Sequence, residues 1–146
     1  MVSKTKEYYL SKITAMSVAE VADTQILTAA MLYPFIKHYG HADVENFLVV
    51  TLSGAHKVLN IHEVTRGIAN KVMVHPREVF RRAITDNAVA IIVAHNHPSG
   101  QLVPSDEDKA ITRRLREAGE LLGITVLDHL ILGRDTYLSF VEDNCF

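Results

Sequence analysis

An apolar run at Ala88–His95, AVAIIVAH, constrains the fold of this chain more than any other feature. The run lacks the polar alternation of a strand with one face in solvent, and it is typical of a strand covered on both faces. A chain of 146 residues is close to the usual size of one domain and is expected to bury about two thirds of its unfolded surface. We therefore expect residues 1–146 to form a single domain with one compact core.

The first third of the chain predicts a helical segment. Val18–Tyr39 has apolar residues at helical spacing, with Pro34 as a kink or break, and the GHAD that follows closes the segment. We expect residues 1–44 to pack as a helical segment on a core formed by residues 45–146.

Two β-branched apolar runs follow, at residues 46–54 and 56–67, and they meet at Ser53-Gly54. This pattern is the signal of an antiparallel hairpin. The next run, IANKVMV at residues 68–74, could add another strand.

A helix is predicted to begin at Pro76, because proline suits the first helical turn, and Asp86-Asn87 end it. Its apolar face would consist of Val79, Phe80, Ala83 and Ile84.

A second helix is predicted after Ser105, a good N-cap with Asp108 three residues later, and Gly123 supplies its C-terminal stop. Its buried stripe would consist of Ile111, Leu115, Ala118 and Leu122. The runs at residues 124–133 and 136–142 read as closing strands. The fold class is therefore α+β, with a central mixed, largely antiparallel sheet flanked by helices.

Charge and cysteine content limit the classes of function. Fifteen basic and seventeen acidic residues give a net charge of −2, so no overall basic field draws the chain to nucleic acid or an anionic membrane. This weakens a nucleic-acid role without excluding it. A single cysteine, Cys145, fits a reducing compartment, and no signal-peptide core or bilayer-length apolar stretch is present in the sequence. We expect a cytoplasmic protein without membrane contact, while its oligomeric state stays open.

Two histidines at the end of the central strand suggest a metal site. His95 and His97 are two residues apart in extended chain, so both imidazoles can face one point, and Pro98 restricts His97 to that conformation. Asp108 lies in the first turn of the next helix, and the loop at residues 99–104 is long enough to fold back. Two neutral imidazoles and one carboxylate leave a fourth position for water, as in catalytic zinc sites.

A plainer interpretation exists for the same residues. An isolated His-x-His is more often a pair of surface histidines at a turn, and Ser105 to Asp108 is also an ordinary helix cap. Five other histidines have no partner at metal-ligand spacing and are expected to be surface or half-buried residues: His38, His41, His56, His62 and His75.

The stretch HNHPSGQLVPSDED at residues 95–108 resembles the JAMM (MPN-plus) metalloprotease motif, which reads His-x-His-Pro, six residues, then Ser-x-x-Asp. Together with VHPREVFRRAI and PSDEDKAITRRLREAGELLGITVLDHLILG, it resembles the bacterial RadC family, sometimes labelled as DNA-repair proteins. The likeness covers about Glu45 to Phe140. It implies a JAMM/MPN-like, cytidine-deaminase-like fold.

The resemblance implies a role for each motif residue. His95, His97 and Asp108 would bind one Zn²⁺ with a bound water, and Ser105 would hydrogen-bond near that water or the developing oxyanion. JAMM enzymes also use a distant glutamate to move the proton. We favour Glu45 over Glu63, against the alternative that both are ordinary surface carboxylates. The implied reaction is hydrolysis of a peptide or isopeptide bond in a protein or peptide substrate.

Some features qualify this reading. Asn96 replaces the serine or threonine usual in deubiquitinating JAMM enzymes, which argues against ubiquitin-like substrates. Longer RadC proteins have a helix-hairpin-helix-like region before this domain, and the residues before Glu45 leave little space for one. We therefore expect DNA binding to be a less favoured role.

The roles of Arg77 and of the pair Asp128-His129 stay open. Neighbours on a strand face opposite sides, so at most one of the pair can point toward a zinc pocket. Asp128 could orient a ligand imidazole, or it could be a buried polar group satisfied by backbone.

Two rival functions remain. One is a catalytically idle RadC-like binding module in a repair, replication or mobile-element complex, and the other is a zinc hydrolase acting on nucleic acid or a small metabolite.

Overall fold

The computed structural model describes residues 23–67 and 74–146, and its five strands form one sheet in the order β2-β1-β3-β4-β5. Strands β3 and β4 are parallel, and the other neighbouring pairs are antiparallel. The strands are β1 (Asn46–Leu52), β2 (Val58–Arg66), β3 (Ala90–Asn96), β4 (Thr125–Leu132) and β5 (Tyr137–Ser139). The helices are α2 (Ala29–Ile36), the 3₁₀ helix η1 (Lys37–His41), α3 (Pro76–Thr85) and α4 (Asp106–Leu122). The predicted α+β class with a mixed, largely antiparallel sheet is confirmed.

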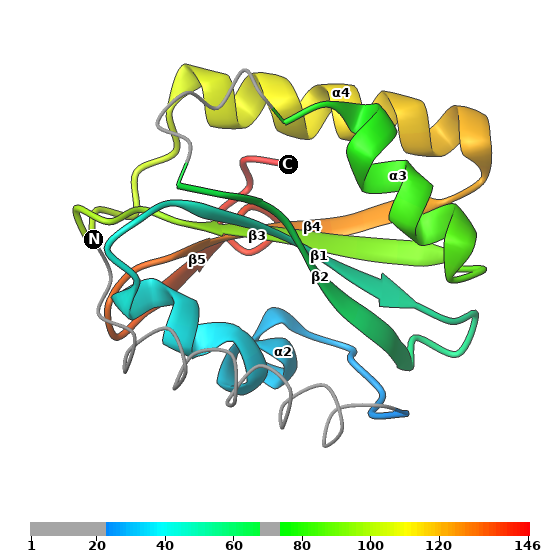
Figure 1. The fold of residues 1–146 in the computed structure, drawn as a ribbon, viewed down its shortest axis with the longest axis horizontal. Coiled ribbons are helices and arrows are strands. Elements are labelled where there is room, and N and C mark those ends of the chain that lie inside the picture. The colour runs from blue at the N-terminus through cyan, green and yellow to red at the C-terminus, as the bar shows by residue number, and fades with distance from the viewer. Residues whose placement is uncertain (1–22, 68–73) are drawn as a thin grey trace.

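Helices cover both faces of the sheet (Figure 1): α2 lies on one face, and α3 and α4 lie on the other. Every residue of β3 is buried, as its apolar run predicted. Its side chains alternate between two cores. Ile92 and Ala94 pack in the core shared with α2, whereas Ile91 and Val93 pack in the core shared with α3 and α4.

The predicted hairpin and helix boundaries agree with the structure. Strands β1 and β2 pair around the turn that begins at Ser53. Helix α3 has Pro76 in its first turn and Asp86 as its C-cap. Helix α4 has Ser105 as its N-cap and Gly123, at φ 71°, as its left-handed C-cap.

The expected N-terminal helix is wrong in part. Residues 18–22 lie outside the described residues, and residues 23–28 are not helical. Gln25 instead forms a bridge with Lys57, so the backbone here extends the sheet edge rather than a helix. The helix begins after its N-cap, Thr28, and continues through Pro34 before tightening into η1.

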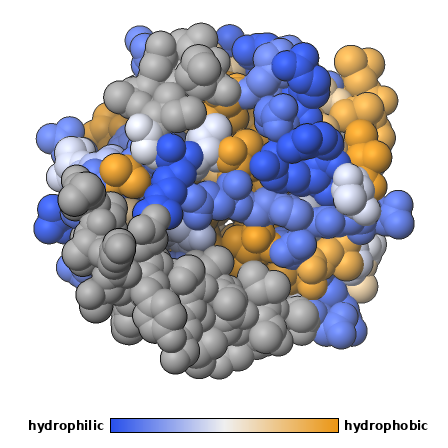
Figure 2. All heavy atoms as spheres, in the orientation of Figure 1, coloured by the Kyte–Doolittle hydropathy of each residue, from blue (hydrophilic) through white to orange (hydrophobic). Residues whose placement is uncertain are grey.

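Two apolar positions were predicted on the wrong side of their helices. Ile84 in α3 is 56% exposed and Leu122 in α4 is 50% exposed. In α4 the buried row runs instead through Gly119, where a Cβ would lie 2.3 Å from the carbonyl oxygen of Ile124. Figure 2, in the same orientation as Figure 1, shows hydrophobic atoms at the right-hand margin of the molecule, which is the side on which α4 ends.

Two strand predictions also change. Strand β5 ends at Ser139, and the chain then turns, so the expected strand at residues 136–142 is too long. The possible strand at residues 68–74 lies outside the described residues except for Val74. Within the described part of the chain, no helix is both long and apolar enough to cross a bilayer.

Candidate metal centre

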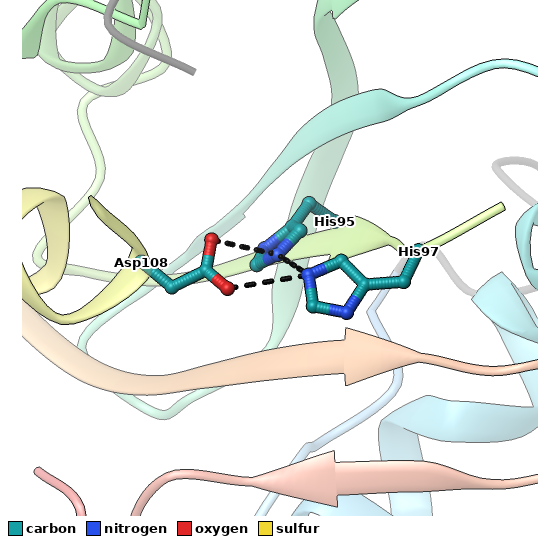
Figure 3. A group of neighbouring side chains, drawn as sticks. All are labelled: His95, His97 and Asp108. Atoms are coloured by element: carbon teal, nitrogen blue, oxygen red, sulfur yellow. Dashed lines mark hydrogen bonds and ion pairs between the residues drawn. The ribbon is translucent and has the colours of Figure 1, made fainter. Parts of the chain in front are cut away.

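The structure brings His95, His97 and Asp108 together (Figure 3), each offering one ligand atom within 4.8 Å of the others. His95 Nε2 lies 3.1 Å from Asp108 Oδ1, and His97 Nε2 lies 3.2 Å from Asp108 Oδ2. The two Nε2 atoms are 3.0 Å apart. Two imidazole nitrogens and a carboxylate oxygen therefore converge on one point, as the spacing predicted.

The chain between these residues is built to fold back. The N–H of His97 donates to the Leu132 carbonyl, which continues the pairing of β3 with β4. A turn follows, in which the Gly100 N–H donates to the His97 carbonyl with Gly100 at φ 81°. The loop then returns to Ser105, which starts α4 and carries Asp108 back over the end of β3.

A capping box fixes the Asp108 carboxylate. The Asp108 N–H donates to Ser105 Oγ at 3.0 Å, and Ser105 N–H donates to Asp108 Oδ2 at 2.9 Å. The helix cap therefore orients the same carboxylate that faces the histidines. The expected contact of Ser105 with a metal-bound water stays a prediction.

The His97 ring is oriented by a backbone group. Its Nδ1 lies 2.7 Å from the Gln101 carbonyl oxygen, so Nδ1 carries the proton and donates there. The lone pair of Nε2 is then directed at the cluster, which is the tautomer that a metal ligand needs.

The His95 ring is oriented by a second histidine and a threonine. His95 Nδ1 lies 2.8 Å from His129 Nε2, and His129 Nδ1 lies 2.5 Å from Thr112 Oγ1. Thr112 Oγ1 donates to the Asp108 carbonyl at 2.6 Å. One arrangement of protons satisfies all three hydrogen bonds. His95 Nδ1–H donates to His129 Nε2, His129 Nδ1–H donates to Thr112 Oγ1, and the Thr112 hydroxyl donates to the Asp108 carbonyl. His95 Nε2 is then also left without a proton.

The pair Asp128-His129 divides between the two sides of the sheet. His129 is fully buried on the side of the cluster, and its ring stacks on Phe140 with centroids 4.7 Å apart. Asp128 accepts hydrogen bonds from Ser139 Oγ and from the backbone N–H groups of His129 and Val141. The suggestion that Asp128 orients a ligand imidazole is therefore wrong, and His129 has that position. Its involvement, like that of Thr112, has no signal in the motif.

Burial and hydrogen bonding act in opposite directions on Asp108, which is 1% exposed. Burial raises the pKa of its carboxyl group. In the metal-free protein, with protons on Nε2 of both rings, hydrogen bonds with His95 and His97 and the charge of His95 lower that pKa, and together with the Ser105 N–H they hold it well below its ordinary value. The carboxylate is therefore ionised over the whole physiological range, as a metal ligand must be.

The two candidate bases occupy different sides of the sheet. Glu45 is half-buried and precedes β1, in which Phe47 pairs with His95 and stacks on its ring. Strand alternation carried back from Phe47 gives Glu45 the same side as the histidines. Glu63 is exposed on β2, and it accepts at 3.4 Å from Oη of Tyr39, a residue of the core on the α2 side. The structure thus keeps Glu63 apart from the cluster.

Arg77 and the scattered histidines are not members of the cluster. Arg77 is exposed in the first turn of α3. Of the scattered histidines, His75 caps α3 and His62 Nε2 lies 2.6 Å from Asp86 Oδ2, while the described residues bring together no other metal-binding group of three.

The donor set fits a metal ion. Neutral imidazoles and one carboxylate are the ligands that zinc accepts in sites with an open fourth position, and both imidazoles have a partner for their other nitrogen. The cluster can therefore hold a divalent metal.

Comparisons with known proteins identify relatives of this chain. Curated relatives called UPF0758 protein, from Pelobacter propionicus and Geotalea uraniireducens, are 52% and 53% identical over 107 and 98 residues. These matches cover 72% and 67% of this chain but 47% and 43% of the relatives. A relative of the same name from Methanospirillum hungatei is 59% identical over 87 residues, which are 60% of this chain and 39% of that protein. The chain thus spans less than half the length of these relatives.

The profile of one protein family, described as the RadC-like JAB domain, matches residues 25–145. This range includes all five strands and the whole His95, His97 and Asp108 cluster. The chain belongs to the RadC-like JAB domain family.

Proposed function

We propose that this chain is a zinc-dependent hydrolase of the JAMM type that cleaves a peptide or isopeptide bond. The observation that carries the proposal is the convergence of His95, His97 and Asp108, with both imidazoles held in the tautomer that ligation needs. The three residues would bind one Zn²⁺ and leave the fourth position to water. When bound, zinc lowers the pKa of that water and polarises a substrate carbonyl.

The chain's own residues would handle the proton. Glu45 would accept a proton at its carboxylate and return it to the leaving nitrogen, which is general acid–base catalysis by one group. Its side of the sheet, next to Phe47 and the histidines, supports this role. The position of Glu63 against Tyr39 supports a structural role for Glu63 instead.

Ser105 would contribute a hydroxyl beside the reacting oxygen while it caps α4. Its Oγ already accepts from the Asp108 N–H, and a hydroxyl has a second lone pair and one proton to offer. Helix capping and oxyanion contact are therefore compatible in one side chain.

The wider setting is part of the proposal. We infer a protein or peptide substrate and a cytoplasmic location, which the lone Cys145 supports. An association with DNA repair rests on the family resemblance alone, and the net charge of −2 gives it no support. The single domain expected for residues 1–146 stays a prediction.

The test is cleavage of a broad peptide and isopeptide library by the zinc-loaded protein. The parent should cleave, Glu45→Gln should lose about 100-fold or more in kcat, and Glu63→Gln should keep its rate. A dead Glu63→Gln with an active Glu45→Gln would overturn the assignment of the base. A zinc-loaded parent that cleaves nothing would favour the idle binding module.

A further inference from the structure

Asn96, the residue between the two histidines, holds the backbone around Glu45. It is fully buried, and its Oδ1 accepts from the Asn46 N–H at 2.7 Å. Its Nδ2 donates to the Val44 carbonyl at 2.9 Å. These groups belong to the peptide units immediately before and after the Glu45 Cα, so one side-chain amide is hydrogen-bonded to both.

These two hydrogen bonds take the place of backbone pairing between β1 and β3. The pairing of β1 with β3 runs from Leu52↔Ala90 to Phe47↔His95 and stops there. Beyond it, the side-chain amide of Asn96 takes the place that a strand backbone would have opposite Asn46. Beyond Phe47 the backbone of β1 is therefore linked to β3 through a side chain and no longer by backbone pairing.

Other contacts hold the same segment. Asn46 is 3% exposed, and the Nδ2 of its side chain donates to the Val44 carbonyl at 3.1 Å. The Gly67 N–H donates to the Glu45 carbonyl at 2.8 Å. Although Glu45 lies outside regular β-structure, the peptide groups on both of its sides are hydrogen-bonded.

We propose that Asn96 is a positioning residue that fixes Glu45 at a set offset from His95 and His97. This inference rests on the proposed role of Glu45 as the base. A base that acts on a metal-bound water must stand about one water molecule away from the metal, and a carboxylate free to approach would become a ligand instead. Asn96 would set such a spacing, because its amide links the backbone on both sides of Glu45 to the end of β3, between the two histidines.

The chemistry of the amide explains the residue type. Asparagine offers one acceptor and two donors on a short planar group, which matches a backbone N–H and a backbone carbonyl together. Aspartate has no donor for the Val44 carbonyl, and serine is too short to reach both groups.

The experiment compares zinc-loaded parent, Asn96→Ser and Asn60→Ser in crystals and in the peptide-cleavage assay. Asn60 is a matched control, because it is a partly buried asparagine of the same sheet whose side chain accepts from a backbone N–H, and its own contact lies on β2. In Asn96→Ser the Glu45 carboxylate should shift by about 1 Å or more while the three ligands stay in place. The amide exchange of Asn46 should rise about tenfold or more, while that of Val49 stays slow.

The kinetic arm separates positioning from general damage. Asn96→Ser should lower kcat about 10- to 100-fold with KM and the zinc Kd within about threefold of the parent. In the Glu45→Gln background the same change should lower kcat by less than about threefold, since the carboxylate that Asn96 positions has already been replaced. Asn60→Ser should behave as the parent.

Three results would overturn the inference: an unmoved Glu45 in the Asn96→Ser crystal, an additive loss in the double variant, or a large loss of zinc affinity. The last would mean that Asn96 supports the ligands rather than Glu45. A parent that cleaves nothing would count against the proposed function. The crystal and exchange measurements need no substrate, so they would still decide whether Asn96 positions Glu45.

Discussion

The imidazoles of His95 and His129 are hydrogen-bonded, with Nδ1 of the first 2.8 Å from Nε2 of the second. This contact joins a candidate ligand on β3 to a buried residue of β4 that does not itself belong to the cluster. It orients the His95 ring and sets which of its nitrogens carries the proton.

His129→Phe should therefore weaken zinc binding by about 10- to 100-fold, because the Nδ1–H of His95 loses its acceptor. His129→Gln, which keeps an acceptor of similar reach, should recover part of the affinity. Competition with a chromogenic chelator measures the zinc Kd, and equal affinity in parent and His129→Phe would show that the contact only packs the core.

Ser105→Ala should destabilise the fold by about 1 kcal/mol, because it removes the acceptor for the Asp108 N–H at the start of α4. Urea unfolding of the metal-free protein measures this change. Thr28→Ala, the N-cap of the short α2, provides a comparison at a helix remote from the cluster. A loss of kcat well beyond that of Thr28→Ala would support a role of the Ser105 hydroxyl in the reaction.

Gly119→Ala should destabilise the protein by about 1 to 3 kcal/mol, although alanine is the better helix former. The new Cβ would lie 2.3 Å from the Ile124 carbonyl oxygen, a backbone atom that cannot rotate away. Gly54→Ala is the control, since the nearest atom to its Cβ would be 4.0 Å away. Equal stability of the two variants would contradict the close packing of Gly119 against the Ile124 carbonyl.

His38 should make stability depend on pH between about 4 and 6.5. Burial lowers the pKa of His38 from 6.5 to about 4 in the fold. Between these values the unfolded chain binds a proton that the folded chain does not, so the stability present above pH 6.5 declines as the pH falls toward 4. His38→Gln should flatten the pH dependence of urea-unfolding stability in this window, and an equal pH dependence in the parent and the variant would contradict the burial of a neutral His38.

The cluster could be predicted from sequence because its determinants are local. Alternation sets the two histidines on one side, Pro98 keeps the chain extended, and the Ser105 cap fixes the turn on which Asp108 lies. These rules do not depend on the rest of the fold.

The role of His129 could not be predicted, because it depends on an irregularity in pairing. Ile91 pairs with Val126 and Ile92 pairs with Asp128, so Leu127 is an extra residue in β4. Such a bulge reverses the alternation beyond it and turns His129 toward the cluster. A reading of β4 as a regular strand assigns the two sides of the sheet wrongly.

The helix expected at Val18–Tyr39 failed in its described part for a related reason. Residues 23–26 make backbone hydrogen bonds with His56 and Val58 at the start of β2. Tertiary pairing overrides the helical spacing of apolar residues there, and only the part after Thr28 is helical.

The most direct test of the account is the metal content of protein purified without added zinc, beside His97→Ala and His41→Ala. We predict about one zinc per chain in the parent and in His41→Ala, and a loss of most of the metal in His97→Ala. A parent without metal that also fails to bind added zinc, or a His97→Ala variant with unchanged content, would contradict the assignment of His95, His97 and Asp108 as a metal centre.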